Sequence, residues 1–343
     1  MRSFTYQRVD TPSAAIHTFG RGEGEGAAAV LSPVQFLAGG TTLVDLMKLD
    51  VMRPQTLVDI NPLHGGALGR IEADQHGLRL GALAHMAEAA DHPAVNRDYP
   101  VIAQSLKLAA SQQIRNMATL GGNVLQRTRC SYFRDTSYAA CNKRNPGSGC
   151  AALDGYNRSH AVLGVSDRCI ATYPGDFAQA LIALDAGIEI AGPKGRRSVP
   201  FAALHRAPGD RPEIETSLAP GEMIASFVVP AARWTRRSLY LKVRDRQSYE
   251  FALASAAVAL DLDGNTVRDA RIALGGLATV PWRAKAAEAA LKGRVLDDPS
   301  ARAAAEAAFA GARAVRHNEF KIALGQRTLV RALREAAAME IRT

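Results

Sequence analysis

The sequence has few cysteines, few aromatic residues and no long apolar run, and each shortage excludes a class of protein. It holds four cysteines and two tryptophans in 343 residues, and aromatic side chains make up 6% of it. No apolar stretch approaches the roughly 18–20 residues that a membrane-spanning helix needs, so we expect no membrane association. The N-terminus, MRSFTYQRVD, lacks the apolar core of a secretory signal, so we expect no export signal on this chain.

The composition also excludes disordered and fibrous proteins. Hydrophobic residues make up 47% of the chain and charged residues 22%, both close to the averages of globular proteins. Glycine (29 residues) and proline (16 residues) are too few for a collagen-like repeat or a disordered linker. A chain of this length can form two or three packed units, so we expect more than one domain.

The positive charge and the cysteines occur together. The chain has a formal net charge of +9, and residues 111–150 carry +5 of it, with six basic side chains against one acid. The same segment holds Cys130, Cys141 and Cys150, and Cys169 follows shortly after it. We interpret this part of the chain as a basic, cysteine-bearing insertion.

The first part of the chain predicts a βαβ unit. A short strand leads into Gly39-Gly40-Thr41-Thr42, and apolar residues follow at helical spacing over Leu43–Leu49. A helix start is expected at Thr11-Pro12-Ser13, and Gly20–Gly26 has the composition of a surface turn. The expected strands are Phe4–Val9, Gln35–Ala38 and Thr56–Ile60.

The rest of the chain is expected to form two further units. We place the boundary between them within Gly192–Gly221, which is rich in glycine, proline and charge. Helices are expected from Trp282 to the end, with a break at Asp297–Ser300. The remaining expected elements are the helices Leu83–Ala90, Val101–Ala110 and Asp176–Asp185 and the strands Leu78–Leu80, Cys169–Thr172, Ile188–Ala191, Met223–Val229, Ser238–Val243, Phe251–Leu262 and Val267–Leu274.

The segment Leu37–Leu43 has the residues of a phosphate-binding turn. Glycines let the backbone approach a pyrophosphate closely and expose successive N–H groups, and threonine hydroxyls add neutral donors. The helix after the turn offers its positive end to the same anion. The segment is neither a G-x-G-x-x-G motif nor a Walker loop, and an ordinary strand–helix turn would explain the same residues.

A second glycine-rich loop, Gln113–Asn123, follows a predicted helix about 80 residues later. It also carries hydroxyl and amide side chains beside two glycines. A long ligand needs both a phosphate site and a second set of polar contacts. The two loops together therefore favour a dinucleotide held between them.

The four cysteines have the spacing C-x10-C-x8-C-x18-C, which leaves several roles open. Four thiolates can hold zinc or a [4Fe–4S] cluster, but the paired C-x2–4-C spacing that is usual for zinc is absent. A cluster bound by four thiolates carries negative charge, which the local excess of basic residues would offset. Disulfides, or four unrelated buried thiols, would also agree with this spacing.

Two charged residues outside these motifs are further candidates. Asp176 precedes an expected helix, where its ordinary role is an N-cap, and Lys242 lies at a charge-dense strand end, where its ordinary role is a solvated charge. The histidines form no metal-spaced pair, and no catalytic Ser/His/Asp or Cys/His arrangement is evident. Tyr132, Phe133 and Tyr138 lie among basic residues, but this stretch is short, so we expect no nucleic-acid binding.

Several segments, in order along the chain, resemble the FAD-binding subunit of the molybdenum hydroxylases, the xanthine dehydrogenase and aldehyde oxidase family. AGGTTLVDLMK resembles the first FAD loop of that family, and QIRNMATLGGN resembles the second. YPGDFAQALIALDA resembles the segment whose Asp contacts the flavin, and YLKVRDRQSYEFALASAAVAL the segment whose Lys faces the cofactor. RIALGGLATVPWRA resembles the closing strand and turn, whereas Gly175 departs from the Ser or Thr that is common before the Asp.

The stretch from Gln126 to Thr172 carries a more specific resemblance. It is similar to the FAD subunit of the bacterial three-subunit, periplasmic-type aldehyde oxidoreductases, which carries a [4Fe–4S] cluster that most xanthine dehydrogenases lack. All four cysteines of this chain match that context. The resemblance therefore favours a cluster over unrelated thiols.

The resemblance implies an α+β fold. A two-subdomain FAD-binding domain of the vanillyl-alcohol-oxidase (PCMH) type, with an inserted iron–sulfur loop, is followed by a C-terminal sheet-and-helix domain. The expected units are residues 1–60 for the first FAD-binding subdomain, 61–215 for the second with the insertion at about 124–169, and 216–343 for the C-terminal domain.

The resemblance also implies the site residues. No residue of this chain is expected to be catalytic beyond the FAD itself, and Lys242 is expected near the isoalloxazine ring. The metal ligands are expected to be Cys130, Cys141, Cys150 and Cys169. The residues expected to bind FAD are Leu37, Ala38, Gly39, Gly40, Thr41, Thr42, Leu43, Ser111, Ile114, Thr119, Gly122, Asn123, Leu125, Asp176 and Lys242.

The implied function is that of a flavin electron-transfer subunit in a molybdenum-dependent aldehyde oxidoreductase. The expected partners are a large subunit with molybdopterin cytosine dinucleotide and a small subunit with two [2Fe–2S] clusters, which form an αβγ heterotrimer. Electrons are expected to pass from the molybdenum site through the [2Fe–2S] clusters to FAD and an external acceptor. The expected compartment is the periplasm if a partner's signal exports the complex, and the cytoplasm otherwise.

Three further functions stay open at this point. The chain could serve another molybdenum hydroxylase, of the xanthine or 4-hydroxybenzoyl-CoA reductase type. It could be a stand-alone FAD oxidase, which would need a substrate base and pocket of its own. It could also be a zinc or iron–sulfur module that binds RNA through the basic insertion.

Overall fold

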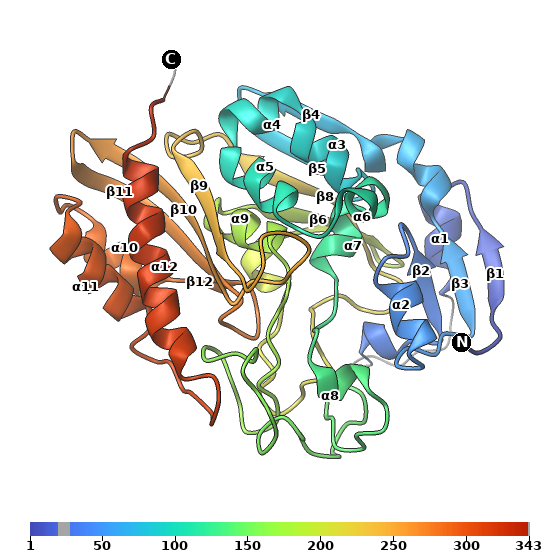
Figure 1. Cartoon of the computed structure of the whole chain (residues 1–343). Coiled ribbons are helices and arrows are strands. Elements are labelled where there is room, and N and C mark those ends of the chain that lie inside the picture. Colours follow the sequence, from blue (N-terminus) through green and yellow to red (C-terminus); the bar gives the residue numbers. More distant parts are fainter. Residues whose placement is uncertain (20–27, 342–343) are drawn as a thin grey trace.

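The computed structural model describes residues 1–19 and 28–341 (Figure 1). The turn expected at Gly20–Gly26 lies outside these residues. The described part contains three β-sheets with helices packed around them, so the expected mixed α and β architecture is confirmed. None of the described helices is both long enough and apolar enough to cross a membrane.

The N-terminal unit is a three-stranded parallel sheet with the order β1-β3-β2. The predicted βαβ arrangement is present, because β2, α2 and β3 follow one another and the two strands pair in parallel. The side chain of Thr11 accepts a hydrogen bond from the N–H of Ala14 and so caps α1 as expected. The bounds are β1 Thr5–Arg8, α1 Pro12–Thr18, η1 Ala29–Leu31, β2 Val34–Leu37, α2 Leu43–Lys48 and β3 Thr56–Asp59.

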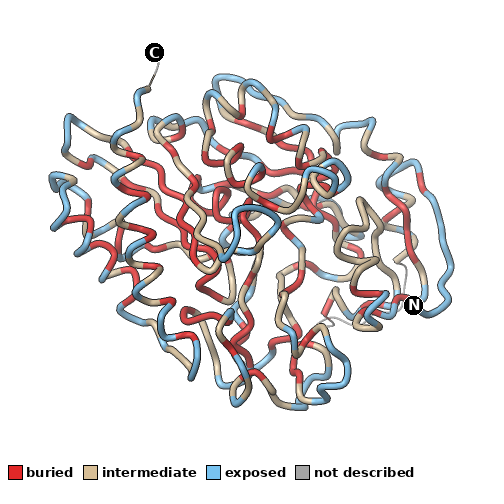
Figure 2. The backbone as a smooth tube through the Cα atoms, in the orientation of Figure 1, coloured by how far each residue is buried: buried red, intermediate tan, exposed pale blue. Residues whose placement is uncertain are grey.

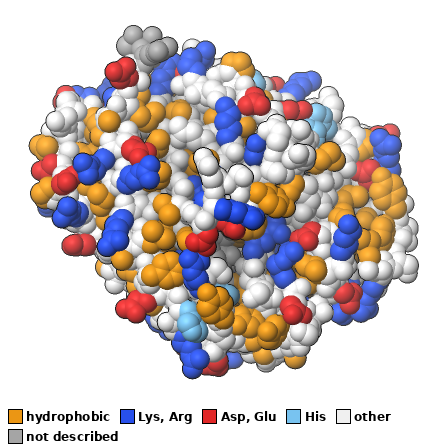
Figure 3. All heavy atoms as spheres, viewed as in Figure 1, with side chains coloured by type: hydrophobic (Ala, Val, Ile, Leu, Met, Phe, Trp, Pro, Cys, Tyr) orange, Lys and Arg blue, Asp and Glu red, His pale blue; other side chains and the backbone are white. Residues whose placement is uncertain are grey.

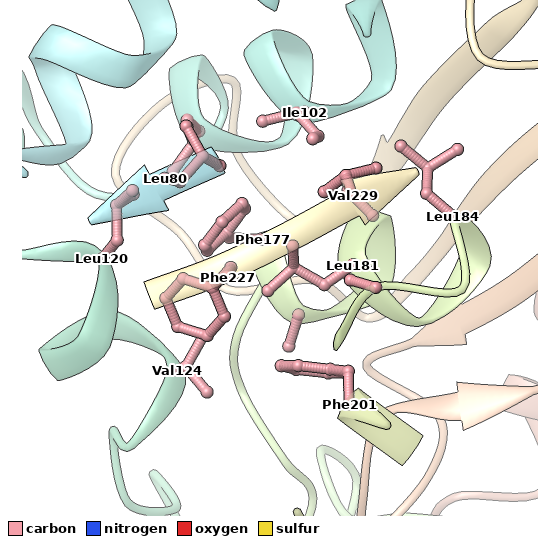
Figure 4. Packing of buried hydrophobic residues seen from close by; sticks show 14 of the residues in the cluster. Leu80, Ile102, Leu120, Val124, Phe177, Leu181, Leu184, Phe201, Phe227 and Val229 are labelled. Atoms are coloured by element: carbon pink, nitrogen blue, oxygen red, sulfur yellow. The ribbon is translucent and has the colours of Figure 1, made fainter. Parts of the chain in front are cut away.

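The central unit is a five-stranded antiparallel sheet with the order β4-β5-β8-β6-β7. Its main core forms where α9, whose seven residues are all buried, packs near Phe227 of β8 and Phe201 (Figure 4). The bounds are η2 Asn61–Gly65, η3 Ala67–Gly69, β4 Ile71–Asp74, β5 Gly77–Gly81, α3 Met86–Asp91, α4 Pro93–Asp98, α5 Pro100–Lys107, α6 Gln112–Met117, α7 Leu120–Val124, α9 Phe177–Ala183, β6 Gly187–Gly192, β7 Gly195–Pro200, η4 Phe201–Ala203 and β8 Met223–Pro230.

The C-terminal unit is a four-stranded antiparallel sheet with the order β12-β11-β10-β9. Helices α10 and α12 pack on this sheet, and α5 and α9 of the central unit also contact its strands. Most residues of the two middle strands, β10 and β11, are therefore buried (Figure 2). The bounds are β9 Ser238–Val243, β10 Ala254–Asp263, β11 Thr266–Gly275, β12 Trp282–Arg283, α10 Lys285–Leu291, α11 Asp298–Ala308 and α12 Phe320–Ala337.

Several elements differ from the sequence expectation. The region Gly192–Gly221 is not merely a linker, because β7 lies in it and pairs with β6. The following strand, β8, pairs with β5 and β6, so the chain leaves the central sheet after Pro230 rather than at residue 215. Trp282 begins a short strand instead of a helix, since Leu274 of β11 is its ladder partner.

The segment between α7 and α9 has almost no regular structure and forms the loops at the bottom of Figure 1. Its one helix within the described residues is α8, Ser131–Arg134. The strand predicted at Cys169–Thr172 is wrong, because only an isolated bridge from Ser166 to Cys169 forms there. The apolar run at this position is buried by tertiary contacts instead of by strand pairing.

Ion pairs attach this irregular segment to the rest of the molecule. Glu215, between β7 and β8, lies 2.6 Å from Nε of Arg127 and 2.9 Å from Nζ of Lys143. Burial raises the pKa of Glu215, but the charges of Arg127 and Lys143 outweigh this effect and lower the pKa to about 2. The carboxylate is therefore ionised wherever the protein is folded at ordinary pH.

This ion-pair group predicts a pH-dependent contribution to stability. The stabilisation from Glu215 should be fully present above the unfolded-state pKa of about 4.3 and be lost as the pH falls towards 2. Replacing Glu215→Gln should lower the free energy of unfolding at pH 7 by on the order of 3 kcal/mol, because two buried cations lose their partner. The difference from wild type should shrink as the pH falls from about 4.3 towards 2, because the unfolded wild-type chain takes up a proton at Glu215 first and the folded protein does so only near pH 2.

Urea unfolding of both proteins across this pH range measures the effect. The control is Glu72→Gln, since Glu72 is exposed on β4 and should change stability by less than about 0.5 kcal/mol. A Glu215→Gln variant with the same difference from wild type at pH 7 and at low pH would contradict the prediction.

Candidate cofactor-binding site

The first glycine turn leaves a run of backbone donors free. It connects β2 to α2, and Gly40 adopts a φ of +70°, which L side chains rarely take. Within the described residues, the N–H groups of Gly39, Gly40, Thr41 and Thr42 donate no hydrogen bond, and neither threonine hydroxyl has a partner. Successive free N–H groups in a turn can form a concave site for an anion, so this loop is suited to a phosphate.

The second glycine loop packs directly against the first. A Cβ atom on Gly39 would overlap the carbonyl oxygen of Met117, so only glycine lets the two loops approach this closely. The donors of the second loop are partly used within the fold, since the N–H of Gly121 donates to the carbonyl oxygen of Ala82 at 2.8 Å. The second loop therefore packs against the first loop and holds it in place, but it does not offer a second run of free backbone donors.

The polar side chains of the second loop divide into capping groups and one open group. The hydroxyl of Ser111 accepts from the N–H of Ile114 and caps α6, and that of Thr119 accepts from the N–H of Gly122 and caps α7. In contrast, Oδ1 of Asn123 is buried and has no hydrogen-bond partner in the described chain. A buried acceptor without a partner is uncommon in folded proteins, which makes Asn123 a candidate ligand contact.

Two hollows meet at the first loop. Thr41, Thr42 and Gln126 line both of them, while Leu37 and Ser111 line neither. Of the remaining expected cofactor residues, the first hollow is lined by Ala38, Gly39, Gly40, Leu43, Thr119, Gly122 and Leu125, and the second by Ile114, Asn123, Asp176 and Lys242. The structure therefore brings most of the expected residues to one continuous region.

A buried ion pair lies in the wall of the second hollow. Nζ of Lys242 on β9 is 2.7 Å from Oδ2 of Asp176 before α9, and their side chains are 1% and 5% exposed. Lys242 also donates to the carbonyl oxygen of Leu108 at 3.1 Å, and the hydroxyl of Tyr240 donates to Oδ1 of Asp176 at 2.6 Å. Burial, aided by the charge of Asp176, raises the pKa of Tyr240 well above its usual value, so this hydroxyl keeps its proton.

These contacts decide between the roles considered for the two charged residues. The side chain of Asp176 makes no capping hydrogen bond to α9. Lys242 is not a solvated surface charge, because its side chain is almost completely buried. Both are instead parts of one polar network that faces the second hollow.

The same hollow has a basic wall. Arg134 binds Asp45 through two hydrogen bonds of 2.7 and 3.1 Å, and Nη1 of Arg129 is 3.2 Å from the same carboxylate. Nε of Arg129 is buried and has no hydrogen-bond partner within residues 1–19 and 28–341, and its guanidinium lies 5.0 Å from the centre of the Phe251 ring. Lys and Arg side chains gather near the centre of the face shown in Figure 3. Two cations on one carboxylate leave a net positive charge, which suits an anionic ligand.

The four cysteines are free thiols that lie near one another. Cys141 and Cys150 face each other in an isolated antiparallel bridge. Burial raises the pKa of Cys130 to about 12 and that of Cys169 to about 11, and the charges of neighbouring thiolates add to both shifts. Through these interactions each cysteine is within electrostatic reach of at least two others. Nε2 of His160 lies 3.1 Å from Sγ of Cys130.

Sequence reasoning missed the side chains that surround the expected residues. Tyr240 lies two positions before Lys242 on the same strand, so an alternation of period two would have placed both on one face. Asp45 lies next to the first loop, but its partners Arg129 and Arg134 are 84 and 89 positions away. No local pattern pairs residues at such a separation.

Two family models together cover almost the whole chain. Residues 3–232 match the FAD-binding domain in molybdopterin dehydrogenase, and residues 239–336 match the CO dehydrogenase flavoprotein C-terminal domain. The change from one match to the other falls between β8 and β9, where the chain leaves the central sheet.

Individual relatives agree with these matches. The aldehyde oxidoreductase FAD-binding subunit PaoB of Escherichia coli (strain K12) is 46% identical over 340 residues, which are 98% of this chain and 99% of that protein. The carbon monoxide dehydrogenase medium chain of Hydrogenophaga pseudoflava is 28% identical over 280 residues, which are 81% and 79% of the two chains. A solved structure of carbon monoxide dehydrogenase from Hydrogenophaga pseudoflava matches with a TM-score of 0.74 and 26% identity, over 98% of each chain. The chain therefore belongs to the family of FAD-binding subunits of the molybdopterin dehydrogenases and is a subunit of an oxidoreductase.

Proposed function

We propose that this chain is the FAD-carrying subunit of a molybdenum-dependent aldehyde oxidoreductase, in which it passes electrons from the partner subunits to an external acceptor. The observation that carries the proposal is the first glycine loop, whose unpaired donors lie where two hollows meet. A dinucleotide has a pyrophosphate between two organic groups, and this arrangement suits such a ligand. The identity of 46% to an aldehyde oxidoreductase FAD-binding subunit supports the choice of complex.

In this proposal the two loops bind the cofactor by different groups. Gly39, Gly40, Thr41 and Thr42 donate N–H and hydroxyl hydrogen bonds to the pyrophosphate. Asn123 supplies its unpartnered Oδ1 to a donor group of the nucleotide. FAD, when bound, supplies the two-electron redox chemistry that the side chains of this site cannot provide.

The network of Asp176, Lys242 and Tyr240 fixes charge beside the flavin end of the site. Lys242 and Tyr240 both donate to Asp176, so the carboxylate cannot rotate away from its place. Fixed donors and charges in a dry site act without reorganising, which is how a protein orients and tunes a bound cofactor. We assign these three residues to orienting the isoalloxazine ring.

We further propose that Cys130, Cys141, Cys150 and Cys169 hold a [4Fe–4S] cluster. Four free thiols within reach of one another are the donor set that such a cluster requires. Lys143 lies close enough to Cys169 to lower the pKa of that thiol, and its charge offsets the negative charge of a four-thiolate cluster. This segment has little secondary structure, so a cluster bound by four of its side chains would also help to order it.

The proposed complex is an αβγ heterotrimer. Its large subunit carries molybdopterin cytosine dinucleotide, and its small subunit carries two [2Fe–2S] clusters. The relatives support this assembly, since their names describe them as a subunit or a medium chain. The compartment follows that of the assembled complex, which is the periplasm if a partner's signal exports it and the cytoplasm otherwise.

A related complex with another substrate is the second candidate. The medium subunit of nicotine 6-hydroxylase from Paenarthrobacter nicotinovorans is 26% identical to this chain, well below the aldehyde oxidoreductase relative. Turnover of the purified complex with aldehydes and with xanthine or N-heterocycles distinguishes the two. The isolated chain should oxidise none of them, and aldehyde oxidation by the isolated flavoprotein would favour a stand-alone oxidase.

The glycine loop generates the first prediction of the proposed function. Gly39→Ala should weaken FAD binding at least about tenfold, because the new methyl group meets the backbone of Met117 and separates the two loops. The FAD released by acid from each purified complex measures occupancy, and titration of FAD into apoprotein measures affinity. Gly65→Ala is the control, because no atom lies within 4 Å of the new Cβ at that position. Full FAD occupancy and unchanged affinity in Gly39→Ala would refute the assigned phosphate site.

The buried network generates the second prediction. Lys242→Met should lower the free energy of unfolding by about 3–5 kcal/mol, because Asp176 loses the partner of its buried charge. Adding Asp176→Asn to this variant should restore part of the loss, since no unpaired charge remains. Exposed Lys48→Met on α2 is the control. The flavin absorbance spectrum and reduction potential should shift in Lys242→Met but not in Lys48→Met, and unchanged values would place the pair away from the ring.

The cysteines generate the third prediction. Cys130→Ser should remove about half of the iron and acid-labile sulfide from the complex, because three thiolates no longer complete the [4Fe–4S] cluster whereas the two [2Fe–2S] clusters of the small subunit remain. Elemental analysis and sulfide assay measure both, and Ser131→Ala is the matched control. Unchanged iron in Cys130→Ser, or zinc in place of iron in the wild type, would contradict the assignment.

A further inference from the structure

Two histidines and a glutamate converge on the surface of the central unit. His64 lies in the 3-10 turn η2, His85 immediately precedes α3, and Glu88 lies in the first turn of α3. One ligand atom from each of the three lies within 4.8 Å of the others. In the part of the chain that the structure describes, this is the one group of three or more His, Cys, Asp and Glu side chains that meets this condition. His64 and His85 are far apart in sequence, so local spacing does not reveal the group.

The separations within the group suit a tetrahedral ion. Nε2 of His64 is 3.1 Å from Oε2 of Glu88, and Nδ1 of His85 is 3.3 Å from Oε1 of the same carboxylate. Metal–ligand bonds of 2.0–2.1 Å in a tetrahedron put neighbouring ligand atoms about 3.3 Å apart. The two imidazole rings stack with their centroids 4.6 Å apart, and one ring nitrogen of each lies within 4.8 Å of the other and of the carboxylate.

The chemistry of these donors selects the kind of ion. Two imidazole nitrogens and one carboxylate suit zinc and neighbouring transition metals, whereas magnesium and calcium prefer oxygen ligands throughout. Glu88 accepts a hydrogen bond from the backbone N–H of His85 at 2.7 Å, which holds its carboxylate beside both imidazoles. The carboxylate is therefore placed to share an ion with the two histidines.

The side chains of the group are partly exposed, which gives an ion access. The exposed fractions are 36% for His64, 27% for His85 and 44% for Glu88. Three protein ligands also leave a fourth position of a tetrahedral ion for water or another small ligand.

The two histidines lie in segments that each hydrogen-bond one of the glycine loops, and we call these segments the supports of the loops. Next to His85, the N–H of Met86 donates to the carbonyl oxygen of Ala118 in the second loop, at 2.9 Å. In the turn that carries His64, Nδ2 of Asn61 donates to the carbonyl oxygen of Ala38 before the first loop, at 3.1 Å. An ion held by both histidines would therefore cross-link the turn that contacts the first glycine loop to the start of α3, which contacts the second.

We infer that His64, His85 and Glu88 form a binding site for Zn²⁺ that cross-links the supports of the two glycine loops. The site is separate from the cysteines and does not depend on their occupant. None of its three ligands lines either hollow, so a bound ion would not touch the proposed cofactor. We therefore assign the site a structural or regulatory role.

The experiment measures Zn²⁺ binding to the assembled, cofactor-loaded complex in competition with a zinc-chelating dye. We compare the wild type with His64→Gln, which removes one ligand from a partly exposed turn, and with His76→Gln as a control. His76 is an exposed histidine in the turn between β4 and β5. Wild type and His76→Gln should bind one more Zn²⁺ per chain than His64→Gln, or bind it roughly tenfold or more tightly.

A second readout is the thermal unfolding midpoint with and without Zn²⁺. An ion that binds only the folded protein should raise the midpoint of the wild type and of His76→Gln but not of His64→Gln. Any Zn²⁺ bound by the cysteines contributes equally to all three proteins and cancels in the comparison. Equal stoichiometry and affinity in all three proteins would overturn the inference and leave a hydrogen-bonded His–Glu–His group, whatever the outcome for FAD.

Discussion

The buried ion pair between Lys242 and Asp176 links the C-terminal sheet to the central unit at the wall of the second hollow. Lys242 belongs to the C-terminal sheet, Asp176 precedes α9 of the central unit, and the same ammonium group binds the carbonyl oxygen of Leu108 after α5. Removing one member would leave a charge buried without a partner, a change that strongly destabilises proteins. The pair thus joins three segments at the place where a hollow meets the first glycine loop, and stability and cofactor site share the same atoms.

The irregular segment between α7 and α9 is likewise held by buried polar side chains from distant parts of the chain. It lacks strands that could satisfy its backbone, so buried side chains of other elements do so instead. Nζ of Lys321 donates to the carbonyl oxygens of Ser159 and His160, and Nδ2 of Asn318 to that of Ala161 at 3.0 Å. Glu215 holds the other side of the segment through ion pairs. Four thiols are thereby kept close together in a part of the chain without regular structure.

The sequence predicted those elements correctly whose conformation is set by neighbouring residues in the chain. The glycine turn between β2 and α2, the cap at Thr11 and the strands β9 and β11 follow from turn chemistry, capping preference and short apolar runs. Sequence reasoning failed at Cys169–Thr172, where an apolar run is buried without pairing to a neighbouring strand. It also placed the domain boundary before β8, because only partner strands show to which sheet a strand belongs.

The sequence alone determined the motifs: two glycine loops, four cysteines in a basic setting, and a family resemblance carried by their order. These depend on residue types at short spacing, which a linear chain displays directly. The tertiary structure alone decided which polar groups are paired. The N–H of Gly121 is used within the fold, whereas those of Gly39 to Thr42 have no partner among the residues that the structure describes. Asp176 is paired with Lys242, and Asp45 with Arg134. Such pairings join residues many positions apart, because burial makes an unpaired charge costly wherever its partner lies in the sequence.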